Sequence, residues 1–230
     1  LDIGSVVGAE GFQPAPPGGR LAGLSDAAFW LRFRLATDPA VRGPLVLEVG
    51  YPLLDHVELF EERPGGGFSR RESGDAVPFA RRELAHPSPA FLIDPPGETP
   101  RNYYLRIRST GGIQAPLRLL RHEAFVAHAA TSQLVLGLFH GMLIVLAAMG
   151  LLLYALMRDR LFLLFAGFIG GYTLLQAALS GIAFALFWPE ATVWASRAPP
   201  VLVALSGLLA AAFVRDFLES RIRLPRLDRL

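Results

Sequence analysis

The chain has 230 residues, a formal net charge of +2 and no cysteine, which excludes disulfides, thiolate metal sites and cysteine nucleophiles. Residues 1–133 hold 14 Arg against 15 acidic residues, whereas residues 134–230 hold 8 Arg against 5 acidic residues. Because the excess positive charge lies beside apolar segments, it reflects membrane topology and does not indicate nucleic-acid binding. Residues 1–20 have no signal-peptide pattern, and since the sequence begins with Leu1 we expect a signal peptide to have been removed already.

The first half of the chain has the pattern of short β-strands. In residues 28–36, Phe29, Leu31 and Phe33 alternate with Trp30 and the two arginines that follow it, so apolar and polar side chains lie on opposite faces. Strands are also predicted for 45–51, 56–61, 68–72, 90–94, 102–108 and 115–120. Pro- and Gly-rich turns separate them, which predicts an all-β jelly roll or antiparallel β-sandwich. Residues 76–86 are expected to form a loop with one edge strand.

Two of these strands carry aromatic and arginine side chains on their polar faces. Trp30 and Arg32 share a face of one strand, and Tyr104 and Arg106 share a face of another. Aromatic rings stack on sugars, and guanidinium groups pair with carboxylates or sugar oxygens. The pattern therefore indicates a surface for a sugar or a small organic acid. The alternative is a solvated outer face whose opposite charges pair across strands.

Catalytic and cofactor motifs are lacking. The histidines have no metal-ligand spacing, and the sequence contains neither a Gly-x-Ser-x-Gly motif nor a phosphate-binding glycine loop before a helix. We therefore predict no catalytic residues, no metal, no cofactor and no enzymatic activity.

Residues 134–157 are uncharged, and His140 is their one strongly polar residue. As a helix, this segment would be about 36 Å long, enough to cross a bilayer core of about 30 Å. Residues 121–133 lack Gly and Pro, so the same helix is expected to extend through them as a helical connector.

Two further spans are predicted, at about 161–188 and 198–214, with Pro199 and Pro200 in the first turn of the third span. The segments 158–160 and 215–230 together hold seven Arg, which the positive-inside rule places in the cytoplasm. This topology predicts a multi-pass protein of the bacterial inner membrane. Its N-terminal domain would be periplasmic and its C-terminus cytoplasmic.

Small and polar residues suggest how the spans pack. Gly137 and Gly141 in the first span, and the pair at 167 and 171 in the second, have the spacing that permits close helix approach. Tyr172, Gln176 and Ser180 form a polar stripe that should face other helices, including His140. An interhelical hydrogen bond is the expected role of this histidine, with a proton relay as the alternative.

Several motifs in this order resemble one family. They are FWLRF at 29–33, GYPLLDHVEL at 50–59, GD at 74–75, PF at 78–79, RR at 81–82, YLR at 104–106, GLFHG at 137–141, Tyr154 with RDR at 158–160, FVRDFL at 213–218 and LPRLD at 224–228. The chain is similar to the bacterial seven-transmembrane receptors with diverse intracellular signalling modules. It departs from them at Ala155, where Asn is usual, and at His140, where an aromatic residue is common.

The resemblance implies a type 2 extracellular jelly roll related to carbohydrate-binding modules, followed by the start of the membrane domain. Family members continue through four more helices into a diguanylate cyclase, histidine kinase or similar module. We therefore expect this chain to be a fragment of a receptor or a truncated relative. Its expected domains are a sensor at 1–120, a connector at 121–133 and a membrane domain with a cytoplasmic tail at 134–230.

The resulting hypothesis is a receptor input half whose partners are a small ligand (sugar or carboxylate), the lipid bilayer and a second copy of the chain. The ligand-binding residues expected from the resemblance and the polar faces are Trp30, Arg32, Tyr51, Asp55, Asp75, Arg82, Tyr104 and Arg106. Tyr51 is the exception in this set, because alternation places it on the core side. The alternatives are a non-signalling envelope protein that docks a protein partner and, more remotely, an ectoenzyme.

Overall fold

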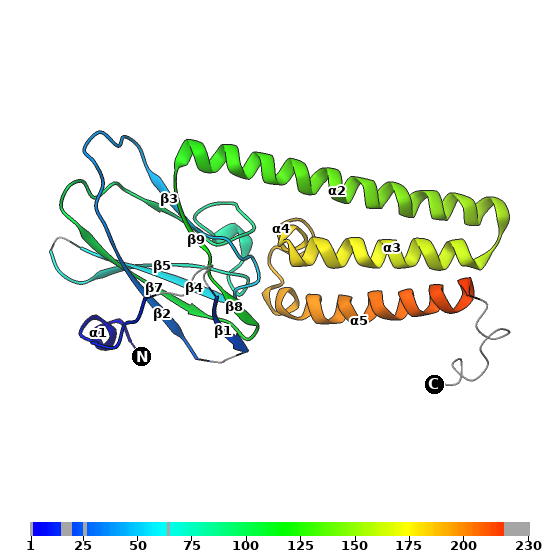
Figure 1. Ribbon diagram of the computed structural model, residues 1–230, viewed down its shortest axis with the longest axis horizontal. Coiled ribbons are helices and arrows are strands. Elements are labelled where there is room, and N and C mark those ends of the chain that lie inside the picture. The colour runs from blue at the N-terminus through cyan, green and yellow to red at the C-terminus, as the bar shows by residue number, and fades with distance from the viewer. Residues whose placement is uncertain (1, 15–19, 25–26, 64, 219–230) are drawn as a thin grey trace. The chain divides into compact units, whose positions relative to one another are not determined.

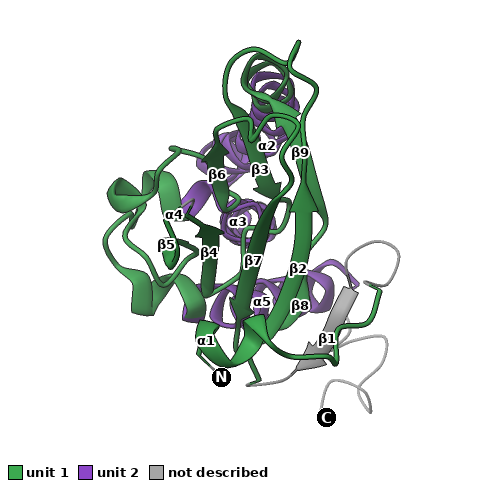
Figure 2. Cartoon of the chain, turned by 90° about the vertical axis from the view of Figure 1, so that its left-hand side faces the viewer, with its two compact units in different colours: residues 1–129, 184–196 green, residues 130–183, 197–230 purple. Residues whose placement is uncertain are grey.

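The computed structural model describes residues 2–14, 20–24, 27–63 and 65–218. The chain divides into two compact units, shown in Figure 2. The β unit comprises residues 1–129 and 184–196, and the helical unit comprises residues 130–183 and 197–230. The predicted cytoplasmic tail beyond residue 218 lies outside the described residues.

The described part of the β unit contains a short helix, a set of strands and the start of a long helix (Figure 1). The short helix α1 is Ile3–Val7. The strands are β1 Arg20–Leu24, β2 Phe29–Leu35, β3 Leu45–Val49, β4 His56–Glu62, β5 Phe68–Ser73, β6 Ala90–Ile93, β7 Arg101–Arg108, β8 Gly112–Gln114 and β9 Leu117–Arg121.

The strands form two antiparallel sheets and a two-stranded ribbon. The four-stranded sheet has the order β2-β7-β4-β5, the three-stranded sheet has the order β6-β3-β9, and β1 pairs with β8. The predicted all-β sandwich is therefore confirmed. The antiparallel pairing of β2 with β7 has no register shift. Phe29 lies opposite Ile107 at one end of it, and Leu35 lies opposite Arg101 at the other.

The core of the sandwich is built from alternate residues of both sheets, as the strand period requires. Phe33 stacks on Tyr103 with ring centroids 5.3 Å apart. Burying each large apolar side chain stabilises the fold by about 1.5–3 kcal/mol, so this shared core holds the sheets together. The buried core residues are Leu45, Leu47, Val49, Leu54, Val57, Leu59, Phe91, Ile93, Tyr103, Leu105, Ile107, Ile113 and Ala115.

Three features of the β unit differ from the sequence expectation. Helix α1 and the ribbon strands β1 and β8 were not predicted, the latter because Gly111 and Gly112 have the composition of a turn. Residues 76–86 form no edge strand; they contain a short 3-10 helix, Phe79–Arg81. Pro78, immediately before it, has no N–H for a ladder and occupies the cap position.

Among the described residues, three helices are long and apolar enough to cross a membrane: α2 His122–Met157, α3 Arg160–Leu179 and α5 Thr192–Phe217. Helix α2 begins in the β unit, directly after β9, and continues into the helical unit without a break. Asp159 separates α2 from α3 and caps α3, because its Oδ1 accepts a hydrogen bond from the backbone N–H of Leu161 at 2.9 Å.

The second and third spans differ from their predicted limits. Helix α3 ends at Leu179 because Gly181 has φ +75°, a left-handed conformation that stops a helix, and the short helix α4 Ile182–Leu186 follows. Helix α5 starts at Thr192, so Pro199 and Pro200 lie inside it rather than in its first turn. Prolines in membrane helices are tolerated where other groups satisfy the freed carbonyls.

Glycines permit close helix contacts inside the helical unit, where α2, α3 and α5 run side by side (Figure 1). A Cβ on Gly171 would lie 3.2 Å from a Leu209 methyl, and one on Gly150 would lie 2.9 Å from Cδ1 of Phe165. The glycine pair predicted for a close contact in the first span makes none, because a Cβ on Gly137 or Gly141 would meet nothing within 4 Å.

Candidate functional site

The outer face of the four-stranded sheet is the part of the β unit where predicted ligand residues meet. Antiparallel pairing of β2 and β7 places Trp30 opposite Arg106 and Arg32 opposite Tyr104. The alternation of a strand sends these four side chains to the face away from the core. Trp30 also contacts the ring of Phe60, with centroids 5.4 Å apart. The structure therefore brings together four of the eight predicted residues.

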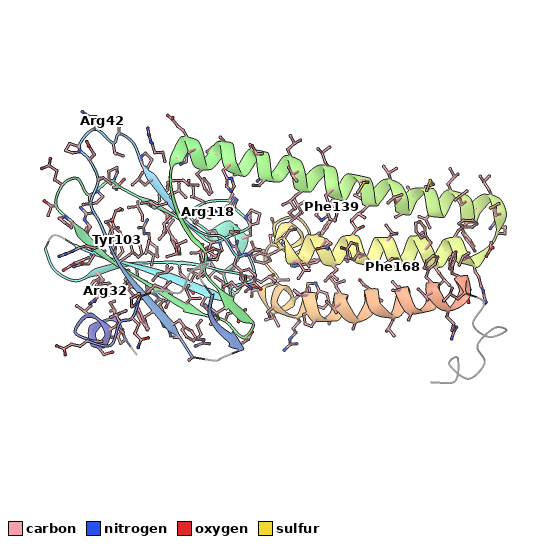
Figure 3. The ribbon with its side chains drawn as sticks, viewed as in Figure 1. Arg32, Arg42, Tyr103, Arg118, Phe139 and Phe168 are labelled. Carbon is pink, nitrogen blue, oxygen red and sulfur yellow. The ribbon has the colours of Figure 1, made fainter. Side chains whose placement is uncertain are left out.

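Residues 3–12 pack on part of this outer face. Val6 is buried against Phe60 and Tyr104, with Ile3 and other partly buried apolar groups around it. The guanidinium of Arg32 lies over the ring of Phe12, at 4.4 Å from its centroid. Figure 3 shows Arg32 on the side of the sheet that carries α1. This covering segment was not predicted, because five helical residues are too few for a periodic pattern.

The first of two hollows on this face is the Glu58 hollow, which has a volume of about 330 Å³. Glu58 is only 3% exposed, and the guanidinium groups of Arg70 and Arg106 both donate hydrogen bonds to its carboxylate. Burial raises the pKa of Glu58, but the hydrogen bonds from the two arginines outweigh burial and hold the pKa below its usual value. The described lining residues are Asp2, Trp30, Glu58, Phe60, Arg70 and Arg106.

Two buried donors at this hollow lack hydrogen-bond partners among the described residues. They are Nε1 of Trp30 and Nε of Arg106. An unpaired buried donor costs about 1–3 kcal/mol, and because solvent does not reach either atom, a ligand in the hollow could pair with them only after the side chains move. The Glu58 hollow thus offers aromatic and guanidinium side chains in a setting where the charges compensate one another.

The second hollow, the Arg32 hollow, has a volume of about 560 Å³. Its described lining residues are Val7, Arg32, Phe33, Arg34, Asn102 and Tyr104. Arg34 lies opposite Asn102 in the β2–β7 ladder. None of the described lining residues carries a negative charge, so the two hollows differ in electrostatics although they share one face.

The remaining predicted ligand residues line neither hollow. Tyr51 packs against the sandwich core, as its alternation indicates. Asp55 holds a loop, because its Oδ2 accepts hydrogen bonds from the backbone N–H and the Oγ1 of Thr110 at 2.7 and 2.8 Å. Asp75 and Arg82 are 5% and 7% exposed, respectively, so both are buried rather than on a solvent-facing surface.

Arg82 fixes the loops at one end of the β unit. Its guanidinium donates to the carbonyl oxygens of Gly74, His86 and Pro87 at 2.7, 3.0 and 2.8 Å. It also lies over the rings of Phe79 and Phe184, at 5.1 and 5.0 Å from their centroids. These contacts assign it a structural role in holding the loops, and burial lowers the pKa of Arg82 to about 10, partly offset by Asp75.

The predicted polar groups of the spans bond within their own helices. His140 Nδ1 donates to the carbonyl of Leu136 at 2.7 Å, which corrects the expected interhelical bond. Gln176 Nε2 donates to the Tyr172 hydroxyl at 2.5 Å. Ser180 Oγ donates to a carbonyl in the preceding turn of α3, that of residue 177, at 3.2 Å. The described residues contain no group of three His, Asp or Glu side chains that could hold a metal ion.

Two family models match this chain. The model described as 7TMR-DISM extracellular 2 matches residues 1–121. The model described as 7TM diverse intracellular signalling matches residues 132–230. Both describe receptor or sensory domains rather than catalytic ones. A search of curated proteins found no match.

Proposed function

The chain belongs to the 7TMR-DISM receptors, which combine an extracellular sensory domain with membrane helices, and we propose that it is the input half of a bacterial sensory receptor for a small periplasmic ligand. In this proposal the ligand is a carbohydrate or an organic acid. It binds the outer face of the four-stranded sheet.

The observation that carries the proposal is the chemistry of that face. Two hollows lie on it, and between them they present Trp30, Tyr104 and four guanidinium groups. Small-molecule sites in proteins combine concave surface with a few such convergent polar groups.

Signal transmission would use α2, which starts immediately after β9 and enters the helical unit as one continuous helix. A continuous helix passes on a shift or rotation that a flexible linker would absorb. The ligand can bias two arrangements of the helices only by the difference between its affinities for them. A cytoplasmic output module further along the receptor, of diguanylate cyclase or histidine kinase type, would respond to that bias.

The proposed location follows from the distribution of arginine. The arginines of segment 158–160 and of the chain after residue 214 would lie in the cytoplasm, and the β unit would lie in the periplasm, if the membrane is the bacterial inner membrane. Two cysteine variants of the cysteine-free chain test this topology. A membrane-impermeant thiol reagent added to intact spheroplasts should label Asp94→Cys and should not label Arg158→Cys.

Calorimetric titration of the full chain in detergent tests ligand binding, with neutral sugars and small carboxylates as probes. Saturable binding of one probe, abolished or weakened by Trp30→Ala, supports the proposal. If every probe fails at millimolar concentration, direct sensing at this face is refuted. Stoichiometric capture of a periplasmic protein, unaffected by small molecules, would favour the alternative of an anchored docking protein.

A further inference from the structure

The two hollows on the outer face differ in net charge. In the Glu58 hollow, both arginines are hydrogen-bonded to one buried carboxylate. In the Arg32 hollow, two arginines face the same space, and no described lining residue is acidic. A neutral ligand suits the first environment, whereas the second attracts an anion.

The difference in charge between the two hollows follows from which arginines of the sheet have glutamate partners. Four arginines of the sheet have glutamate partners within 4.0 Å among the described residues: Arg70, Arg71, Arg101 and Arg106. Arg32 and Arg34 form no ion pair with any described residue, and the interaction found for Arg32 is with the Phe12 ring. Arg108 likewise has no ion pair with a described residue, but it lines neither hollow.

The geometry of the Arg32 hollow is suited to an oxyanion. Arg32 and Arg34 are two residues apart on β2, so their side chains leave the same face about 7 Å apart. The Phe12 ring lies 4.4 Å from the Arg32 guanidinium and restricts its orientation. Asn102, opposite Arg34, is fixed by its amide hydrogen bond to Glu62 at 2.7 Å. Guanidinium groups form strong charge-assisted hydrogen bonds to carboxylate or phosphate.

We propose that the Arg32 hollow binds the anionic group of the receptor's ligand, a carboxylate or a phosphate, through Arg32 and Arg34. This inference rests on the proposed function and narrows it, because the ligand is then a small organic acid or an acidic sugar rather than a neutral sugar. The volume of about 560 Å³ is sufficient for such a molecule.

Pairs of probes with similar shape and different charge show whether binding depends on the negative charge of the ligand. The full chain in detergent is titrated with succinate and succinamide, with galacturonate and galactose, and with inorganic phosphate. The carboxylate members should bind at least about tenfold more tightly than their neutral counterparts, as expected for one charge-assisted hydrogen bond. Binding of phosphate alone would identify phosphate as the anionic group.

Single substitutions then show which arginines bind the negative charge of the ligand. Arg32→Gln and Arg34→Gln should each weaken binding of the anionic probe by about 10- to 100-fold. Arg108→Gln is the matched control, because Arg108 lies on the same outer face, four residues from Tyr104 along β7, and its loss should leave binding unchanged.

The outcomes distinguish this inference from the proposed function. Equal binding of charged and neutral probes, with Arg32→Gln and Arg34→Gln unaffected and Trp30→Ala defective, overturns the anion site and leaves the receptor proposal intact. An equal loss in Arg108→Gln also overturns it, because the effect would then be one of general charge. The failure of every probe overturns both proposals.

Discussion

Asparagine in place of Asp75 should stabilise the β unit above neutral pH. Asp75 is 5% exposed, and its Oδ1 has no hydrogen-bond partner among the described residues. Burial, the negative charge of Asp55 and a hydrogen bond with that side chain raise the pKa of Asp75 from 3.8 to about 7, although Arg82 opposes the shift. The folded protein therefore binds a proton at this site more tightly than the unfolded chain does.

The sign and size of the effect follow from linkage. The stability that the proton provides is fully present below about pH 4 and is lost as the pH rises through about 7. At about 1.4 kcal/mol per pKa unit, the upper limit of the loss is about 4 kcal/mol. Because asparagine carries no charge, Asp75→Asn should lack this contribution to the pH dependence of the unfolding free energy. It should be more stable than the parent at about pH 8.

Urea unfolding of the full chain in detergent, at about pH 5 and pH 8, measures this difference. Trp188→Phe and Trp194→Phe in all variants leave Trp30 as the single tryptophan, so its fluorescence reports on the β unit. Asp94→Asn is the control, because Asp94 is an exposed carboxylate beyond the end of β6. The reasoning is refuted if Asp75→Asn loses stability between the two pH values in parallel with the parent.

Glu58→Gln should lower the unfolding free energy by about 1–3 kcal/mol at neutral pH, because two arginines lose their charged partner. Since the folded pKa of Glu58 is held below 4.5, the parent alone should lose this contribution as the pH falls below that value; equal acid sensitivity of both proteins contradicts this. Gly74→Ala places a Cβ 2.2 Å from a backbone oxygen and should reduce stability by about 3 kcal/mol or more, measured by the same urea titration. Gly43→Ala, at φ +78° with nothing within 4 Å, should lose only about 1 kcal/mol, and equal losses would exclude the clash as the cause. Gly150→Leu should reduce the thermal stability of the detergent-solubilised chain, because its Cβ position is 2.9 Å from an aromatic carbon of α3. Gly137→Leu meets no atom there and should be neutral; a loss of the same size would argue against a specific α2–α3 contact.

Period-2 alternation was sufficient to predict the sandwich. The strand at 28–36 was predicted from its clean alternation, and β2 was found at Phe29–Leu35. Elements that depend on tertiary contacts had no such signal: β8 has three residues and includes Gly112. Breaks in apolar segments were equally hard to predict, since Gly181 ends α3 through its left-handed φ and not through any loss of hydrophobicity.

The candidate site was predictable only where it follows from strand alternation. Trp30 and Arg32 on one strand, and Tyr104 and Arg106 on the next, were expected on polar faces, and the ladder placed them side by side. Sequence reasoning missed Arg34 and Asn102 as lining residues of a hollow. It also missed the cover provided by residues 3–12, because long-range contacts of a short segment leave no periodic trace.

No residue separates the end of β9 from the start of α2. Arg121 is still paired with Leu45 in the three-stranded sheet, and His122 is already helical. The direction in which every later side chain of α2 points is therefore set by counting residues from a hydrogen-bonded strand. One inserted residue would turn the rest of the helix by about 100° and lengthen it by about 1.5 Å, whereas seven would nearly restore the original phase. The rotation of α2 about its own axis, relative to the strand that precedes it, therefore depends on the exact number of residues at this junction.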